Sequence, residues 1–109
     1  MIDTNKPLWQ ASAVDIAESV AAGDITCADA VGAAVGRMNE VNPNLNAVVM
    51  DLSDGAMAEA EAADKALAGG AKPGPLQGVP VTIKVNIDQK GWATTNGVPA
   101  YKDMIAPDD

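Results

Sequence analysis

The stretch GPLQGVPVTIKVNID, residues 74–88, contains the side chain best suited to chemistry in this sequence, the amine of Lys84. Aliphatic and polar residues alternate through its second half: Val81, Ile83, Val85 and Ile87 alternate with Thr82, Lys84, Asn86 and Asp88. This alternation is typical of a β-strand with one apolar and one polar face. On the pattern alone, the face that carries Lys84 is expected to meet solvent. The functional alternative is a lysine that is partly desolvated, loses its proton near neutral pH and serves as the general base for a serine.

The other side chains exclude most alternative catalytic arrangements. The chain has no histidine, so it cannot form a Ser-His-Asp triad or a Cys-His pair, and its one cysteine, Cys27, cannot complete a Cys/His zinc site. We find no P-loop, dinucleotide fingerprint or calcium-loop spacing, and we expect neither a cofactor nor a metal. Cys27 lies at the start of a predicted helix, where the pKa of a thiol can fall. Without a histidine beside it, we interpret Cys27 as a structural residue.

The composition indicates one small, acidic domain with a modest core. Of the 109 residues, 48% are hydrophobic, but Ala and Val dominate and Phe is absent. The formal net charge is −8 and the seven basic residues are scattered, which argues against a nucleic-acid surface and against an anionic membrane surface. No apolar run is long enough to span a bilayer, and the first residues lack the apolar stretch of a secretory signal. We therefore expect a cytoplasmic protein, consistent with the single cysteine.

Two helices are predicted in the first half of the chain. The first covers 12–24, with Ser12 as the N-cap, Asp15 in the position of a capping box and Gly23 at its end. The second covers 26–41, with Thr26 as the N-cap. We expect Pro43 to stop this second helix, because proline cannot continue the backbone hydrogen bonding.

The second half is predicted to alternate between strands and a helix. Residues 47–52 and 79–87 indicate strands, and 53–70 indicates a helix with Ser53 as the cap and glycines at its end. Residues 92–109 show no clear period and indicate irregular loop with at most a short strand. The order predicts the α/β class with one βαβ-like unit. Two strands are too few for an independent sheet, so we expect further strands from elsewhere.

The motif that contains Lys84 resembles the N-terminal part of the amidase signature family. The matching positions are Gly74, Pro75, Leu76, Gly78, Val79, Pro80, Lys84, Asn86, Ile87, Thr94, Thr95 and Gly97. The resemblance implies an incomplete piece of the amidase signature fold, made of N-terminal helices and the first strands of a mixed sheet. In this interpretation 1–109 is an N-terminal fragment of an amidase domain, with a helical lead-in and one strand over 1–73. The strand that carries the lysine, and the loop after it, cover 74–109.

The resemblance also implies a reaction and a role for Lys84. Members of the family hydrolyse linear amides with a Ser–cis-Ser–Lys triad, and Lys84 would be its base. Asn86, Asp88 and Thr95 would support the surroundings of the lysine. The sequence departs from the family in two ways: Val85 stands where many members carry aspartate, and the only serines, Ser12, Ser19 and Ser53, all precede Lys84. With both catalytic serines absent, we expect the isolated chain to be inactive.

Two alternatives remain open from the sequence. One is a non-catalytic acidic α/β module that binds a partner or self-associates, and the other is a fragment of a tRNA-dependent amidotransferase subunit. The expected partner is the remainder of an amidase chain or a second copy of this chain, with a small-molecule amide as substrate and neither nucleic acid nor membrane. Because a partial fold exposes strand edges and apolar faces, we expect the isolated chain to form oligomers.

Overall fold

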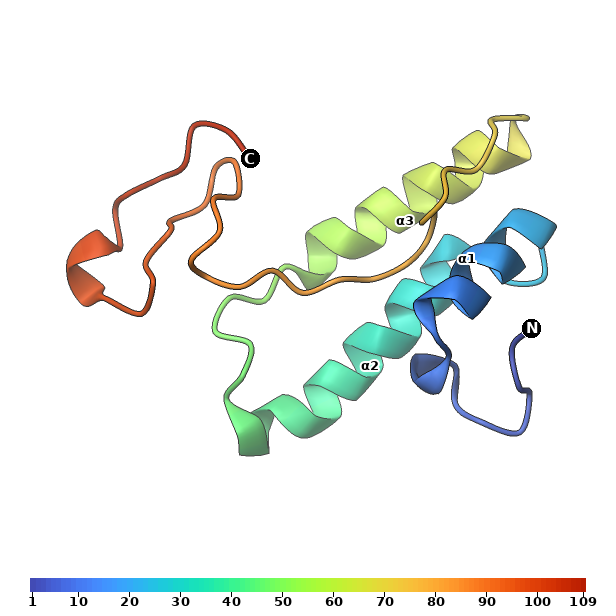
Figure 1. Ribbon diagram of the computed structural model, residues 1–109, viewed down its shortest axis with the longest axis horizontal. Helices are drawn as coiled ribbons and strands as arrows, with labels where there is room; N and C mark the ends of the chain where they lie inside the picture. The colour runs from blue at the N-terminus through green and yellow to red at the C-terminus, as the bar shows by residue number, and fades with distance from the viewer.

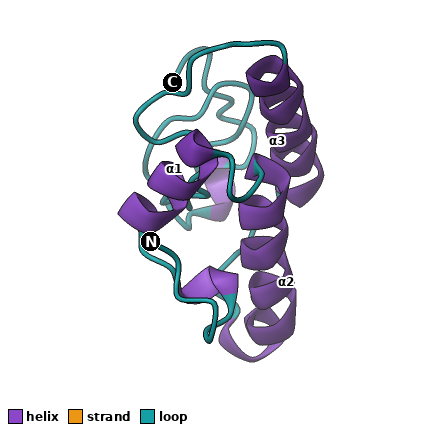
Figure 2. Cartoon of the chain, turned by 90° about the vertical axis from the view of Figure 1, so that its right-hand side faces the viewer, coloured by secondary structure: helices purple, strands orange, loops and turns teal.

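The computed structural model describes all residues, 1–109, as three α-helices followed by a long irregular segment. The helices are α1 (Ala13–Ala22), α2 (Cys27–Leu45) and α3 (Ser53–Ala68), and two short 3₁₀ turns are η1 (Leu8–Gln10) and η2 (Pro99–Tyr101). Helices α2 and α3 lie side by side and run in opposite directions, and α1 crosses near the start of α2 (Figure 1). Apart from the helices, the chain consists of loops and turns (Figure 2).

Helix α1 begins and ends where its sequence predicts. The Ser12 hydroxyl oxygen accepts a hydrogen bond from the Asp15 N–H at 3.1 Å, and Gly23 ends the helix in the left-handed conformation at φ 80°. The capping box is incomplete, because the Asp15 carboxylate accepts from the Ser12 hydroxyl and from the Met1 ammonium, each at 2.7 Å, and not from the Ser12 N–H. Ser12 therefore caps α1 alone.

Helix α2 has a complete capping box at its start but ends later than predicted. Thr26 and Asp29 exchange two hydrogen bonds of 2.9 Å, as the sequence indicates. The prediction that Pro43 stops the helix is wrong, since α2 continues to Leu45 and Asn46 forms its cap at φ 51°. Pro43 lies in the last turn, where its missing N–H leaves one carbonyl unpaired. The Asn42 side chain stabilises this end by accepting from two following backbone N–H groups at 2.9 Å.

Helix α3 forms where the sequence predicts, but a different residue caps its start. Ser53 is the first helical residue and does not act as the N-cap. The carboxylate of Asp51 instead accepts from the backbone N–H of Ser53 at 2.9 Å and from its hydroxyl. An acidic side chain at this position suits the positive end of the helix dipole. Gly69 ends the helix as predicted.

Neither predicted strand forms, so the α/β prediction and its sheet are not confirmed. Residues 47–52 form loop and bend, and 79–87 form loop and a turn. The backbone N–H groups from Val81 to Asn86 donate no hydrogen bond within the chain. The only β-type pairing is an isolated bridge between Ala93 and Ile105. A strand needs a neighbour that supplies donors and acceptors along its length, and the one backbone hydrogen bond of 79–87 to a distant segment is that of the Asn96 N–H to the Val85 carbonyl at 3.4 Å.

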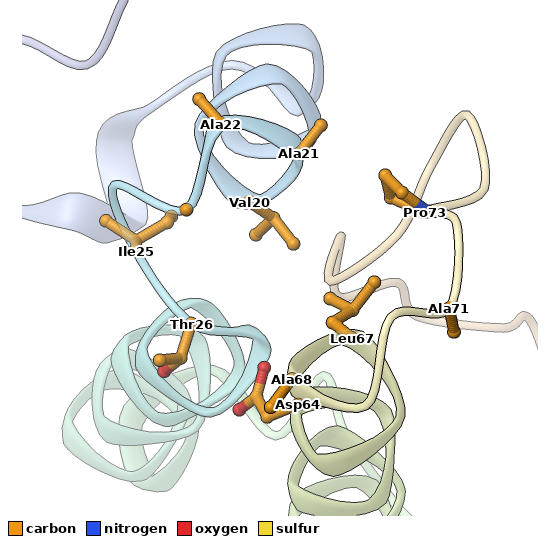
Figure 3. A pocket seen from close by; sticks show the side chains of 11 residues that line it. Val20, Ala21, Ala22, Ile25, Thr26, Asp64, Leu67, Ala68, Ala71 and Pro73 are labelled. Atoms are coloured by element: carbon orange, nitrogen blue, oxygen red, sulfur yellow. The ribbon is translucent and has the colours of Figure 1, made fainter.

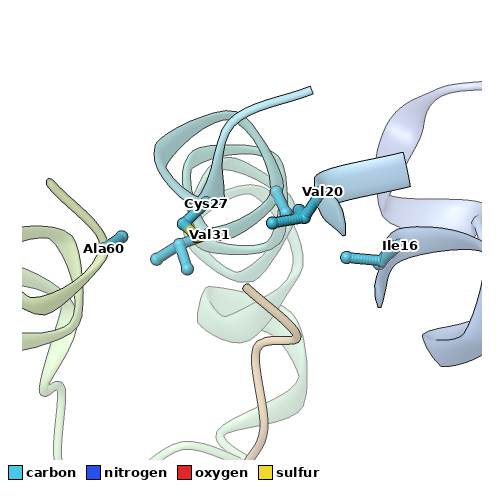
Figure 4. Packing of buried hydrophobic residues seen from close by; sticks show 6 residues of the cluster. Ile16, Val20, Cys27, Val31 and Ala60 are labelled. Atoms are coloured by element: carbon cyan, nitrogen blue, oxygen red, sulfur yellow. The ribbon is translucent and has the colours of Figure 1, made fainter. Parts of the chain in front are cut away.

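The core is small and lies where the three helices meet. Only 9 of the 109 residues are buried, and the main cluster consists of Ile16, Val20, Cys27, Ala30, Val31 and Ala60 (Figure 4). The radius of gyration is 15.5 Å, whereas a compact domain of this length has about 13 Å. Val81, Ile83 and Ile87 remain 77%, 50% and 59% exposed. The chain thus leaves a large part of its apolar surface without a partner.

No helix of the chain is both long enough and apolar enough to cross a membrane.

Candidate active site

The segment that carries Lys84 returns along the helices and is anchored at its beginning. After α3 the chain crosses back over the helices toward the C-terminal loops, which lie to one side of them (Figure 1). Val79 packs against the helical core, and its N–H donates to the Leu76 carbonyl at 3.1 Å. Beyond Val79 the chain runs unpaired to Lys84, whose carbonyl accepts from the Ile87 N–H at 3.0 Å. Lys84 therefore sits at the start of a turn, at the end of a segment anchored on the core.

The side chain of Lys84 is exposed, and its amino group forms no hydrogen bond or ion pair within the chain. The solvent-facing interpretation of the alternating pattern agrees with this position. However, the apolar side of the same segment is exposed as well, as Val81 and Ile83 show. The alternation therefore does not separate a buried face from a solvent face in this chain.

The two halves of the sequence motif converge. The Thr94 hydroxyl donates to the Asp88 carboxylate at 2.5 Å, and the Asn96 N–H donates to the Val85 carbonyl at 3.4 Å. Asn96 and Gly97 both have left-handed backbones, at φ 49° and 74°, which turns the chain sharply. These contacts place the Thr-Thr-Asn-Gly stretch beside the turn that begins at Lys84.

The three candidate supporting residues, Asn86, Asp88 and Thr95, differ in their hydrogen bonding. Asp88 is held by Thr94, a residue that the prediction of supporting groups omits although it belongs to the Thr-Thr-x-Gly part of the motif. The Thr95 hydroxyl accepts from the Gly97 N–H at 3.3 Å, so it stabilises the local turn. Asn86 is exposed, and its side chain forms no hydrogen bond within the chain. Thr94 is one of the positions that match the family motif. It would have been found if every polar residue among those positions had been taken as a candidate.

None of the three serines is hydrogen-bonded to Lys84. Ser12 caps α1, and Ser53 is bonded to Asp51 at the start of α3. Ser19 is 5% exposed and lies on the buried side of α1. The chain therefore offers the lysine no serine partner for nucleophilic catalysis.

Cys27 has the environment of a structural residue. It is fully buried at the first position of α2, and burial raises the pKa of its thiol, with a further increase from the nearby Asp64 carboxylate. A thiol that stays protonated is a poor nucleophile. The interpretation of Cys27 as structural, made from the lack of histidine, agrees with this environment.

Asp64 joins α3 to the first turn of α2. Its two carboxylate oxygens accept from the Cys27 N–H at 2.7 Å and from the Ala28 N–H at 3.0 Å. Figure 3 shows Asp64 reaching from α3 toward this turn, close to Thr26. Although partial burial acts to raise it, the pKa of Asp64 is held below its usual value by these backbone hydrogen bonds. Asp64 thus satisfies two backbone N–H groups that the helix itself leaves unpaired.

A groove of about 360 Å³ lies beside this contact, between the ends of the three helices and the loop after α3 (Figure 3). Val20, Leu67 and Pro73 contribute apolar walls, and Asp64 lies at its edge. None of Lys84, Asn86, Asp88 and Thr95 lines it. The groove and the candidate catalytic lysine are therefore separate features.

Comparisons with known proteins agree with the motif. The family model described as Amidase matches residues 29–109. An indoleacetamide hydrolase from Bradyrhizobium diazoefficiens is 53% identical over 103 residues, which cover 94% of this chain and 20% of that protein. A glutamyl-tRNA(Gln) amidotransferase subunit from Streptomyces avermitilis is 34% identical over all of this chain, which covers 22% of that protein.

A solved structure supports the same assignment at the level of the fold. A bacterial aryl acylamidase of the amidase signature family superposes with a TM-score of 0.84 at 31% identity, covering 93% of this chain and 21% of that one. The chain belongs to the amidase signature family. It spans about a fifth of the length of the relatives it matches.

Proposed function

We propose that this chain is the N-terminal part of an amidase that hydrolyses linear amides, and that it supplies the lysine of a Ser–cis-Ser–Lys triad. The observation that carries the proposal is the 53% identity to an indoleacetamide hydrolase over nearly the whole chain. We further propose a small primary amide such as indoleacetamide as the substrate. The free, buried Cys27 is consistent with a reducing compartment, and we propose the cytoplasm.

In this mechanism Lys84 acts as a general base through a bridging serine. Its neutral amine accepts the proton of the bridging serine, which in turn accepts the proton of the nucleophilic serine. The nucleophilic oxygen attacks the amide carbonyl, and the C–N bond breaks as the leaving amine takes up a proton. Water then hydrolyses the acyl-enzyme and regenerates the serine. Both serines lie outside these 109 residues, so the isolated chain is expected to be inactive.

Backbone and side chains around Lys84 lack partners within the chain. This supports a catalytic site that is completed by another part of the protein. Lys84 has no partner within the chain, the neighbouring N–H groups are unpaired, and Val81, Ile83 and Ile87 are exposed. We propose that the remainder of the amidase chain covers this segment, pairs its backbone and places the serine hydroxyl beside the amine. Desolvation of the lysine would then favour its neutral form.

The first prediction concerns the full-length enzyme with Lys84 replaced. We expect Lys84→Ala to lower kcat for indoleacetamide by about 10²–10⁴-fold, because a general base contributes a factor of this size. Lys84→Arg keeps a positive charge that cannot be removed near neutral pH, so it should be as inactive as the alanine variant. Ammonia release measures the activity.

Lys102→Ala serves as the matched control, since Lys102 is also exposed and forms no ion pair. It should retain the activity of the unmodified enzyme. An active Lys84→Arg variant would show that charge, and not proton transfer, is what this position provides.

A second candidate function is that of a tRNA-dependent amidotransferase. It is supported by the 34% identity, across the whole chain, to the glutamyl-tRNA(Gln) amidotransferase protein from Streptomyces avermitilis. The higher identity to the hydrolase favours the first candidate. Transfer of ammonia to glutamyl-tRNA(Gln), without hydrolysis of indoleacetamide, would reverse this order. A full-length protein with neither activity would favour the non-catalytic binding module.

A further inference from the structure

The loop that precedes Lys84 touches the helical core at Gly78 and at the valine after it. Gly78 has a left-handed backbone at φ 78°, and a Cβ placed on it would lie 2.9 Å from Val20 Cγ2, 3.2 Å from Cys27 Sγ and 3.3 Å from Cys27 Cα. Among the glycines of the chain, only Gly78 meets atoms this closely. The backbone of the loop therefore packs directly on α1 and on the first turn of α2, where only glycine fits.

The surfaces that Gly78 touches are held firmly. Val20 is 4% exposed, and both Val20 and Cys27 belong to the core cluster between α1 and α2 (Figure 4). The N–H of Cys27 is bonded to Asp64 of α3 at 2.7 Å, so its Cα cannot easily retreat. A side chain at position 78 would have to displace the loop, because the buried core residues Val20 and Cys27 leave no room for it.

Gly78 and Val79 form the last anchored point before Lys84. Val79 packs on the core and closes a turn onto Leu76. From Val81 to Lys84, no backbone N–H donates a hydrogen bond. In the full-length enzyme, a displacement at position 78 shifts the point at which the segment that carries Lys84 leaves the helical core.

We infer that Gly78 is a positioning residue for the amidase reaction: by allowing the loop to contact Val20 and Cys27, it sets where Lys84 is presented. This inference rests on the function proposed above. Helices α1, α2 and α3 then have a role in the reaction, in addition to forming the core of the chain. Val20 of α1 and Cys27 of α2 contact this glycine, and Asp64 of α3 holds the N–H of Cys27, so each helix contributes to where Lys84 lies.

The test is a double-mutant cycle in the full-length enzyme with Gly78→Ala, Lys84→Ala and both together. An activated aryl ester is the substrate, because its good leaving group keeps the turnover of the lysine variants measurable. We expect Gly78→Ala to lower kcat by about 10–100-fold with little change in KM, since misplacement of a catalytic group by about 1 Å can have this effect. In the Lys84→Ala background the same change should alter kcat by less than about twofold.

Two further variants separate positioning from folding. Gly70→Ala introduces the same change at φ 93° with nothing within 4 Å, and it should retain the original kcat. Val20→Ala removes the atom at 2.9 Å but leaves Cys27 Sγ at 3.2 Å and Cys27 Cα at 3.3 Å. The loss of kcat caused by Gly78→Ala should therefore be smaller in the Val20→Ala background than in the original enzyme, without being abolished.

Equal losses from Gly78→Ala with and without Lys84 would overturn the inference and leave the function of Lys84 intact. An equally large loss of kcat from Gly78→Ala in the Val20→Ala background, or loss of folded protein in both Gly78 variants, would overturn it as well. A fully active Lys84→Ala enzyme would instead refute the proposed function.

Discussion

Among the single residues, Asp64 completes the hydrogen bonding of the first turn of α2. Its carboxylate accepts two backbone N–H groups 36 and 37 residues away in the sequence, beside a fully buried cysteine. Hydrogen bonds to an ionised group are stronger than those between neutral groups. Because the bonded turn is also the one that Gly78 contacts, Asp64 links the stability of the helices to the position of the Lys84 segment.

Replacement of Asp64 is expected to loosen the pairing of α2 and α3. We expect Asp64→Ala to lower the free energy of unfolding of the chain by about 1–3 kcal/mol, because two N–H groups lose a charged acceptor. Urea unfolding followed by the helical circular dichroism signal measures the change. Glu61→Gln is the matched control, since Glu61 is an exposed carboxylate on the same helix without a hydrogen-bond partner, and it should change stability by less than about 0.5 kcal/mol.

The contribution of Asp64 also depends on pH in a defined direction. Its pKa in the folded chain is lowered, so the contribution is fully present above the unfolded pKa of about 3.9 and is lost as the pH falls through the folded value. The stability difference between the unmodified chain and Asp64→Asn should therefore shrink in strong acid. A difference that stays constant down to about pH 2 would contradict the assigned role of the carboxylate.

At the scale of elements, the helices depend on local contacts and the predicted strands on distant ones. Ser12, Thr26 and Gly23 act within a few residues of their own position, so the starts of α1 and α2 and the end of α1 could be predicted from the sequence. The end of α2 could not, because the side chain of Asn42 compensates for Pro43. The strands predicted at 47–52 and 79–87 do not form, since pairing needs a neighbour that these residues do not provide.

The same distinction applies to the candidate site. The motif identified Lys84 and its neighbours, but it gave no indication that Asp88 would pair with Thr94 or that Asp64 would bond Cys27. The second contact joins residues 37 positions apart, and it depends on how α2 and α3 pack. Sequence patterns predict contacts of this kind poorly, because no local propensity selects the partner.

Hydrogen exchange tests the state of the segment 79–87. In the 109-residue chain, the amides of Val81, Ile83 and Val85 should exchange rapidly, because they donate no hydrogen bond. In the full-length enzyme we expect the same amides to be strongly protected as the segment pairs in a sheet. The amide of Val31 in α2 provides the protected reference in both samples. Rapid exchange in the full-length enzyme would mean that the segment never becomes a strand.

The whole molecule consists of three packed helices and a long irregular segment that leaves apolar side chains exposed. Few residues are buried, and the extents of 46 × 32 × 20 Å reflect C-terminal loops that extend away from the helices. Exposed aliphatic residues and unpaired N–H groups occur together along the Lys84 segment. These features agree with the fact that the chain spans about a fifth of its relatives and match our proposal that the rest of an amidase covers this segment.

We propose that this chain supplies the catalytic base of an amidase. Replacing the matching segment of the indoleacetamide hydrolase from Bradyrhizobium diazoefficiens with residues 1–109, at 53% identity, tests this role. The measurement is kcat for indoleacetamide in this chimera and in its Lys84→Ala and Lys102→Ala variants. We predict an active chimera, an unchanged Lys102→Ala variant and a Lys84→Ala variant slowed by about 10²–10⁴-fold. Equal activity of the chimera and its Lys84→Ala variant would contradict the claim.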